Sequence, residues 1–345
     1  MEQEHKRRVR YKGTHPRSYR EKYKELNPEK YQADVEKIVQ SGKTPAGMHI
    51  PIMVEEILDV LQIQPGQTGY DATLGYGGHT RRMLEALQGQ GHLYATDVDP
   101  IESEKTRKRL ADLGYGPDIL TIRRMNFAQA DQVAPGVQFD FVLADLGVSS
   151  MQIDNPQRGF TFKFDGPLDL RLDPSSGVPA AQRLRELDQE ELTALLVENA
   201  DEPYAAAIAK AVRKVFKSGG AIETTKQLAA VIESALSFLP QAERREAVKK
   251  SCQRTFQALR IDVNSEFEVL YSFLEKLPDI LKSGGRAAVL TFHSGEDRLV
   301  KQAFRQYQRQ GIFSEVSQDV IRPSAQECYQ NPRARATKLR WAVRA

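Results

Sequence analysis

A chain of 345 residues, with 28% charged and 40% hydrophobic residues, has the composition of a soluble globular protein and the length of one large or two ordinary domains. No apolar run approaches the ~20 residues of a membrane helix, and the first residues lack the apolar core of a signal peptide, so we expect a cytoplasmic protein that contacts no membrane. The two cysteines, Cys252 and Cys328, lie far apart and outside any C-x-x-C pattern, which excludes a disulfide framework and gives no metal site.

The formal net charge of +3 is unevenly distributed along the chain. Residues 1–30 contain ten Lys or Arg against five Asp or Glu, and Tyr11, Tyr19 and Tyr23 lie between them. Such a segment is suited to bind RNA phosphates and to stack on bases, although a solvated tail explains the same pattern equally well. We therefore predict a basic N-terminal extension over residues 1–45.

Short apolar strands alternate with helices in the first half of the chain. An amphipathic helix is predicted at 52–61, because its apolar residues recur at helical spacing. Strands are predicted at 69–72, 92–97, 120–123 and 139–144, with helices at 80–88 and 100–113 between them. This alternation predicts an α/β fold with a Rossmann-like, doubly wound parallel sheet.

The alternation of short strands and helices stops after Asp145. Residues 146–178 are rich in Gly, Pro, Asp and Ser, and a loop of that length is usually functional. Helical patterns follow at 188–199, 203–217, 224–238 and 241–258. The sheet pattern then returns with a helix at 266–277, a turn at 283–285, a strand at 286–292, a helix at 296–308 and a strand at 338–343. The sequence thus predicts one domain formed by 46–155 and 260–345, with a mainly helical, substrate-recognising insertion at 156–259.

A glycine loop follows the first predicted strand, in the stretch Asp71-Ala72-Thr73-Leu74-Gly75-Tyr76-Gly77-Gly78-His79. Glycines allow a sharp turn and close approach of the backbone to a ligand, and the helix that follows points its N–H groups at that ligand. Asp97 ends the second strand, where a carboxylate is suited to bind ribose hydroxyls. A dinucleotide loop would have a third glycine where Thr80 stands, so S-adenosylmethionine (SAM) is favoured over NAD and a methyltransferase over an oxidoreductase.

Asp145 ends the fourth strand, which places it beside the glycine loop, because the carboxyl ends of parallel strands line the ligand crevice. Further motifs then make a specific match. The chain resembles the bacterial 16S rRNA cytosine-N4 methyltransferase family, often called MraW, over about residues 46–345. The matching blocks are 49–52, 71–79, 145–154 with 158–160, 165–173, 254–261, 292–294, 296–298 and 331–335.

This resemblance implies a SAM-dependent methyltransferase that modifies the N4 amine of a cytidine in the decoding centre of 16S rRNA, in the small ribosomal subunit. We further predict catalytic roles for Asp145 and Ser149, in which Asp145, or backbone carbonyls of residues 146–148, accept hydrogen bonds from the cytidine amine. The resemblance also implies SAM contacts from Gly77, Gly78, His79, Asp97, Phe127, Asp145 and Gln152. Monomer and homodimer both fit the sequence.

Substrate contacts are predicted from charged and aromatic residues in the same motifs. The predicted set is Arg158, Phe160, Phe162, Arg171, Arg254, Arg260 and His293. Arginines are suited to bind phosphates and the two phenylalanines to stack on the target base. Competing interpretations are internal ion pairs for Arg158, Arg171 and Arg260, favoured for Arg171, a small satellite core for the phenylalanines, and a structural role for His293.

Several positions depart from the family pattern. Leu170 and Leu172 replace the usual methionines, which conserves volume. Gly295 replaces the usual leucine, which is expected to loosen the turn after His293. Together with the basic extension, these differences leave open a paralogue that methylates another RNA site. A separate alternative is a SAM-binding ribosome-assembly factor with little catalysis, although the intact Asp71, Asp97 and Asp145 count against it.

Overall fold

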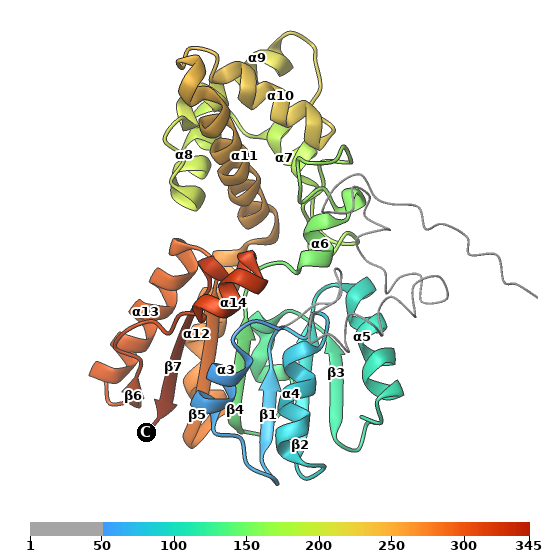
Figure 1. Ribbon diagram of the computed structural model, residues 1–345, viewed down its shortest axis with the longest axis vertical. Coiled ribbons are helices and arrows are strands. Elements are labelled where there is room, and N and C mark those ends of the chain that lie inside the picture. Colours follow the sequence, from blue (N-terminus) through green and yellow to red (C-terminus); the bar gives the residue numbers. More distant parts are fainter. Residues whose placement is uncertain (1–50) are drawn as a thin grey trace, which may run out of the picture. The chain divides into compact units, whose positions relative to one another are not determined.

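A computed structural model of the protein describes residues 51–345. The predicted extension 1–45 and the first two residues of the block 49–52 lie outside this range. A seven-stranded sheet in the order β3-β2-β1-β4-β5-β7-β6 forms the centre (Figure 1). Its strands are β1 (Thr68–Asp71), β2 (His92–Asp97), β3 (Leu120–Arg124), β4 (Phe139–Asp145), β5 (Leu281–Thr291), β6 (Phe313–Val316) and β7 (Lys338–Arg344). The predicted α/β fold with a doubly wound sheet is confirmed.

One strand reverses the otherwise parallel sheet. Strands β1 to β5 pair in parallel, whereas β7 lies antiparallel between β5 and β6. The chain leaves β6 at the carboxyl edge of the sheet and stays at that edge before β7. Strand β7 therefore starts at this edge and runs antiparallel to both of its neighbours. The sequence patterns did not predict β6 or this reversal.

The predicted turn at 283–285 is a bulge inside β5. Phe139 of β4 pairs with Leu281, but Phe141 pairs with Arg286, so extra residues of β5 are accommodated between the two pairs. Gly284 has a φ of 76°, which favours glycine. Beyond the bulge, the register places the end of β5 beside Asp145.

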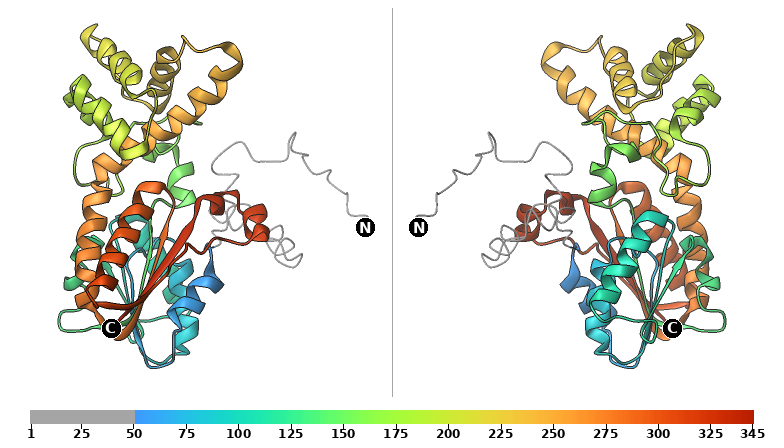
Figure 2. Two further views of the ribbon diagram at one scale, coloured as in Figure 1. Left: turned by 90° about the vertical axis from the view of Figure 1, so that its left-hand side faces the viewer. Right: turned by 90° about the vertical axis from the view of Figure 1, so that its right-hand side faces the viewer.

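Helices cover both faces of the sheet (Figure 2). Helices α3 (Val54–Leu61), α4 (Gly78–Leu87) and α5 (Pro100–Asp112) pack on one face. The other face is covered by η2 (Phe127–Gln132), α12 (Glu266–Ile280) and α13 (Ser294–Arg309). From Phe141 to Ala144, successive side chains of β4 enter the two cores alternately, as the period of a strand requires.

A glycine in β1 makes room for an aromatic ring of the neighbouring strand. Gly69 pairs with Phe141, and a Cβ atom on Gly69 would lie 2.0 Å from Cε2 of that ring. We expect Gly69→Ala to lower the free energy of unfolding by about 2–3 kcal/mol, because the buried ring must shift. Urea unfolding would measure this as a lower midpoint with an unchanged slope. Combining it with Phe141→Leu should cost less than the two single changes together, and strict additivity would contradict the steric explanation.

Residues between β4 and α12 contain a separate helical core. Its helices are α7 (Ala180–Glu186), α8 (Gln189–Ala200), α9 (Ala205–Lys217), α10 (Thr225–Ala235) and α11 (Gln241–Asn264). These helices, with Phe160 and Leu168, bury their own apolar cluster. Helix α11 runs beyond residue 259, and Ser265 alone, with a φ of 49°, separates it from α12. The boundaries 156 and 259 therefore stay a prediction.

Four short helices lie near the carboxyl edge of the sheet. They are α6 (Ser150–Asp154), η3 (Pro156–Arg158), α14 (Ala325–Gln330) and η4 (Pro332–Ala336). Between residues 51 and 345, no helix combines the length and the apolar character needed to cross a membrane.

Candidate active site

The glycine loop joins β1 to α4 and leaves backbone groups open. Gly77 precedes α4 with a φ of 80°, and a Cβ atom there would lie 2.6 Å from Cγ2 of Thr106. Beside Gly75, with a φ of 48°, the space is open except for one carbonyl oxygen at 3.8 Å. No side chain in the described part of the chain caps the first turn of α4. Its N–H groups are therefore available to a ligand.

Asp71 holds this loop in place rather than facing a ligand. Its Oδ2 accepts a hydrogen bond from the Thr80 hydroxyl at 2.6 Å, and its Oδ1 accepts one from the Thr73 N–H at 3.0 Å. Burial raises the pKa of Asp71, and these two hydrogen bonds oppose that rise. The carboxylate thus fixes the end of β1 to the start of α4.

Asp97 lies at the end of β2 and fastens the same loop from the other side. Its Oδ2 accepts from the Gly75 N–H at 2.7 Å, and its Oδ1 accepts from the Asp99 N–H at 2.8 Å. Burial raises the pKa of Asp97 to about 6, although both hydrogen bonds lower it. A carboxylate oxygen has more than one lone pair, so Asp97 retains acceptor capacity for hydroxyl groups.

Asp145 is positioned by the loop and by His79. Its backbone N–H donates to the Thr73 hydroxyl oxygen at 2.7 Å, and its Oδ2 lies 3.3 Å from Nδ1 of His79. Nε2 of His79 lies 2.9 Å from the carbonyl oxygen of Ile52, so both ring nitrogens face acceptors. Burial lowers the pKa of His79, but the hydrogen bond and charge of Asp145 outweigh it, and the net change is a rise.

The second oxygen of the Asp145 carboxylate is the most informative atom of the site. Oδ1 is buried and has no hydrogen-bond partner among residues 51–345. A buried acceptor without a donor is costly, so this atom suits a ligand that brings an N–H or O–H group.

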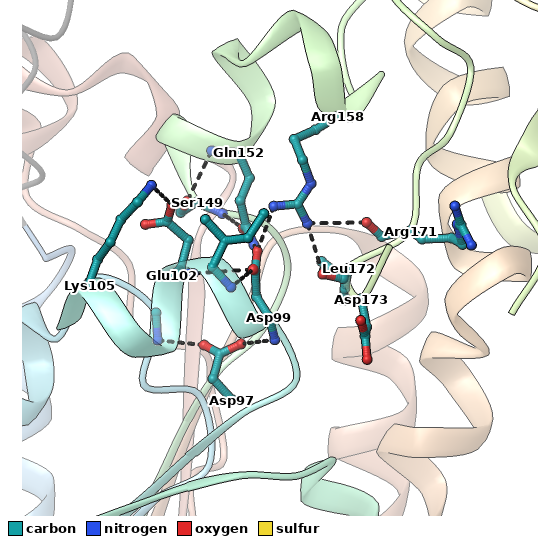
Figure 3. A network of polar contacts seen from close by, with 12 residues as sticks. Asp97, Asp99, Glu102, Lys105, Ser149, Gln152, Arg158, Arg171, Leu172 and Asp173 are labelled. Atoms are coloured by element: carbon teal, nitrogen blue, oxygen red, sulfur yellow. Dashed lines mark hydrogen bonds and ion pairs between the residues drawn. The ribbon is translucent and has the colours of Figure 1, made fainter. Parts of the chain in front are cut away.

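Asp99, which sequence reasoning did not single out, is the centre of a buried polar network (Figure 3). Its Oδ1 accepts from the first N–H groups of α5, and its Oδ2 accepts from Nε2 of Gln152 at 2.8 Å and from Nη1 of Arg158 at 2.7 Å. The side chain is 0% exposed. The signal for it was local, because Asp followed by Pro100 is typical of a helix start.

Arg158 extends this network to the Gly- and Asp-rich loop (Figure 3). Its Nη2 donates to the carbonyl oxygens of Arg171 at 3.2 Å and Leu172 at 2.8 Å. Gln152 and Ser149 form a reciprocal capping box at the start of α6. The structure therefore brings Ser149, Gln152 and Arg158 close to the turn that follows Asp97, while the roles predicted for them stay predictions.

The three aromatic residues predicted for the site pack in or against hydrophobic cores. Phe127 packs edge-on against Phe273, with ring centres 5.4 Å apart. Phe160 is buried in the helical core, and Phe162 packs 5.6 Å from Phe256 in the same core. The arrangement matches the competing interpretation of a small core, and stacking on a base stays a prediction.

The remaining predicted arginines are dispersed. Arg171 forms an ion pair with Asp169 at 2.7 Å, which agrees with the interpretation favoured for it. Arg260 pairs with Glu266 at 2.7 Å, and although burial lowers the pKa of Arg260, the charge of Glu266 produces a net rise. Arg254 lies further along α11 toward its N-terminal end, where it lines a surface cavity of the helical segment.

His293 lies beside the Arg260–Glu266 pair and starts α13. Its Nε2 is 3.2 Å from Oε1 of Glu296, and the two residues form a capping box. A Cβ atom on Gly295 would lie 2.6 Å from Cζ of Phe267. The ring of Phe267 thus occupies space that a side chain at position 295 would need, and the expectation of a loosened turn stays a prediction.

A doubly wound sheet with a glycine loop after β1, and carboxylates that end β1, β2 and β4, defines the class of enzymes that bind a nucleotide-containing cofactor at the carboxyl edge of the sheet. The chain belongs to the MraW methylase family, whose model matches residues 46–345. A protein of Agathobacter rectalis named ribosomal RNA small subunit methyltransferase H 1 is 64% identical over 345 residues, covering 100% of this chain and 99% of that protein. A protein of Alkaliphilus metalliredigens named ribosomal RNA small subunit methyltransferase H 2 is 59% identical, covering 100% and 99%.

The solved structures that match the chain have much lower sequence identity than these relatives. An rRNA methylase from Streptococcus thermophilus is 13% identical, with a TM-score of 0.41, and the match covers 86% of this chain and 98% of that one. The family membership, in contrast, decides between the two cofactors weighed from the glycine loop, and the cofactor is SAM.

The residues at the site fit SAM. The open space beside Gly75 leaves room for a ligand against the backbone. Asp97 has acceptor capacity for the ribose hydroxyls, and the uncapped start of α4 suits the carboxylate of the methionine part. We expect Phe127 to pack on the adenine.

The pKa of Asp97 predicts how SAM affinity depends on pH. Only the ionised carboxylate accepts hydrogen bonds from both ribose hydroxyls, so protonation should weaken binding. With a pKa of about 6 in the free protein, the dissociation constant should be constant above pH 7 and rise about fivefold between pH 6 and pH 5. Calorimetric titration would measure it. Asp97→Asn should bind more weakly at every pH and lose this dependence, and a wild-type affinity that does not change between pH 7 and pH 5 would contradict the assignment.

Proposed function

We propose that the protein transfers a methyl group from SAM to the N4 amine of a cytidine in the decoding centre of 16S rRNA, within the small ribosomal subunit. Membership of the MraW methylase family and the names of the relatives support an rRNA substrate. The unpartnered Oδ1 of Asp145 is the observation that supports an acceptor group with its own hydrogen-bond donor, and the amine of cytosine is such a group. The resemblance to the cytosine-N4 methyltransferases selects this amine over a hydroxyl.

Cytosine N4 is a weak nucleophile, because its lone pair is delocalised into the ring. A hydrogen bond from the amino group to Oδ1 of Asp145 draws the N–H bond toward the carboxylate and favours a lone pair localised on nitrogen. His79 fixes the orientation of the carboxylate through Oδ2. Asp145 is thus oriented before the substrate arrives, which avoids a cost of reorganisation during the reaction.

SAM supplies an activated methyl group on a sulfonium. The N4 atom forms the new N–C bond while the C–S bond breaks, the electron pair of that bond goes to sulfur, and one amine proton is lost. The unpartnered Oδ1 of Asp145 supports a role for this atom as the acceptor of that proton. The target base must leave its stack to reach this position. Arg254, Arg260 and His293, on α11 and at the start of α13, are the proposed contacts to the RNA around it.

A transfer assay followed by nucleoside analysis tests this function. Purified protein and SAM with a tritiated methyl group are incubated with small subunits and with naked 16S rRNA from cells that lack the gene. We expect label in N4-methylcytidine. Label in another nucleoside would instead support the paralogue, and SAM binding without transfer would support the assembly factor.

A further inference from the structure

The outer face of α13 carries a row of cations that the active site does not use. Arg298, Lys301, Arg305 and Arg309 follow one another at spacings of three or four residues. At 3.6 residues per turn, the four positions fall within an arc of about 80°. Gln302, Gln306 and Gln310 border the same face, and the opposite face, with Val300 and Phe304, is buried. We call these four residues the α13 basic row.

The cations of the α13 basic row have no ion-pair partner in the described part of the chain. None of its four side chains forms an ion pair or a hydrogen bond within residues 51–345. Asp297, on the same helix, is already paired with Lys338 at 3.0 Å and Arg340 at 2.7 Å. Helix stability explains only Arg309, which lies in the last turn, where a cation interacts favourably with the helix dipole.

The row connects the catalytic edge of the sheet to its outer strand. Helix α13 starts directly after β5, and Leu290 near the end of β5 pairs with Asp145. The helix then packs along β7 and the edge strand β6 (Figures 1 and 2). From Arg298 to Arg309 the helix rises about 16 Å. The row therefore begins near the carboxyl ends of the strands and leads away from them.

We propose that the α13 basic row is a docking surface for an RNA phosphate backbone, which holds the strand next to the target cytidine along the edge of the sheet. The proposal rests on the proposed function. Four unpaired cations on successive turns match a line of phosphates in charge and direction, and exposed glutamines add donors for phosphate and sugar oxygens. An exposed row of like charges with no base-reading geometry predicts affinity without sequence preference.

Removing two charges from the far half of the row tests the proposal. We expect Arg305→Gln/Arg309→Gln in the full chain to raise the KM for small subunits and the Kd for a 16S rRNA fragment by about tenfold. The slope of log affinity against log salt should fall by about 2, one for each lost phosphate contact. The affinity for SAM and the kcat at saturating subunits should not change. Lys105→Gln/Lys108→Gln on α5 removes the same charge elsewhere and should leave both affinities near wild type.

Three results would overturn the proposal. One is a salt slope and affinity for RNA that do not change in the α13 variant, and another is an equal loss in the α5 control. The third is a loss of binding to subunits with unchanged binding to the RNA fragment, which would assign the row to a ribosomal protein. Failure of the proposed function is recognised separately, because the wild-type protein would then transfer no methyl group to the subunits.

Discussion

Asp145→Asn is expected to lower kcat by about 100- to 1,000-fold while the affinity for SAM stays within about threefold of wild type. His79 needs an acceptor at 3.3 Å, so the amide oxygen of the asparagine should turn toward it. The amide NH₂ then takes the place of Oδ1 and presents a donor to the amino group of cytosine. Two donors facing each other cannot form the hydrogen bond that the proposed mechanism needs.

Single-turnover rates and calorimetric SAM titrations would check this result. Asp140→Asn is a matched control, because Asp140 lies on the same strand but pairs with Lys282 and the Thr68 N–H, away from the glycine loop. It should leave the rate of transfer near wild type. A loss of SAM affinity with a normal rate at saturation would assign Asp145 to the cofactor, and an unchanged rate with unchanged affinity would remove it from the mechanism.

Arg158→Met is expected to lower the free energy of unfolding by about 3–5 kcal/mol, because it leaves a buried charge on Asp99 without its partner. The change also removes the donors to the carbonyl oxygens of Arg171 and Leu172. Since the same carboxylate holds Gln152, the affinity for SAM should fall as well. Chemical unfolding with and without SAM would measure both effects.

The control for this prediction is Arg124→Met. Arg124 pairs with Asp173 at 2.8 Å, but its side chain is 49% exposed, so the expected loss is below about 1 kcal/mol. If Arg158 instead acted only on RNA phosphates, the stability and the SAM affinity of Arg158→Met would equal those of the wild type. The KM for small subunits would then rise alone, and this outcome would contradict a structural role.

Strong local patterns predicted most of the fold. Helical and strand periods located β1 to β4, the helices between them and the helical segment, because each of these elements buries a continuous face. Strand β6 was missed since only its first and last residues, Phe313 and Val316, are buried, and its pairing with β7 shifts register between them. Helix α14 was missed because none of its residues is buried, which leaves no apolar period.

Site residues at the end of a strand could be predicted from the sequence, whereas site residues held by partners distant in the chain could not. Asp97 and Asp145 end their strands, so topology alone placed them near the glycine loop. The partner of Arg158 is 59 residues away in the chain, and no local pattern indicates such a pair. The two oxygens of Asp145 differ because Oδ2 contacts His79 and Oδ1 contacts nothing, and no sequence motif predicts this difference.

The most direct measurement of the central claim is the map of methylated nucleotides in 16S rRNA from cells with the gene, without it, and with Asp145→Asn in its place. Mass spectrometry of defined rRNA fragments would locate and identify each modification. We predict N4-methylcytidine at one cytidine of the decoding centre, present with the wild-type gene and absent in the other two strains. An identical modification pattern in all three strains would contradict the proposed function.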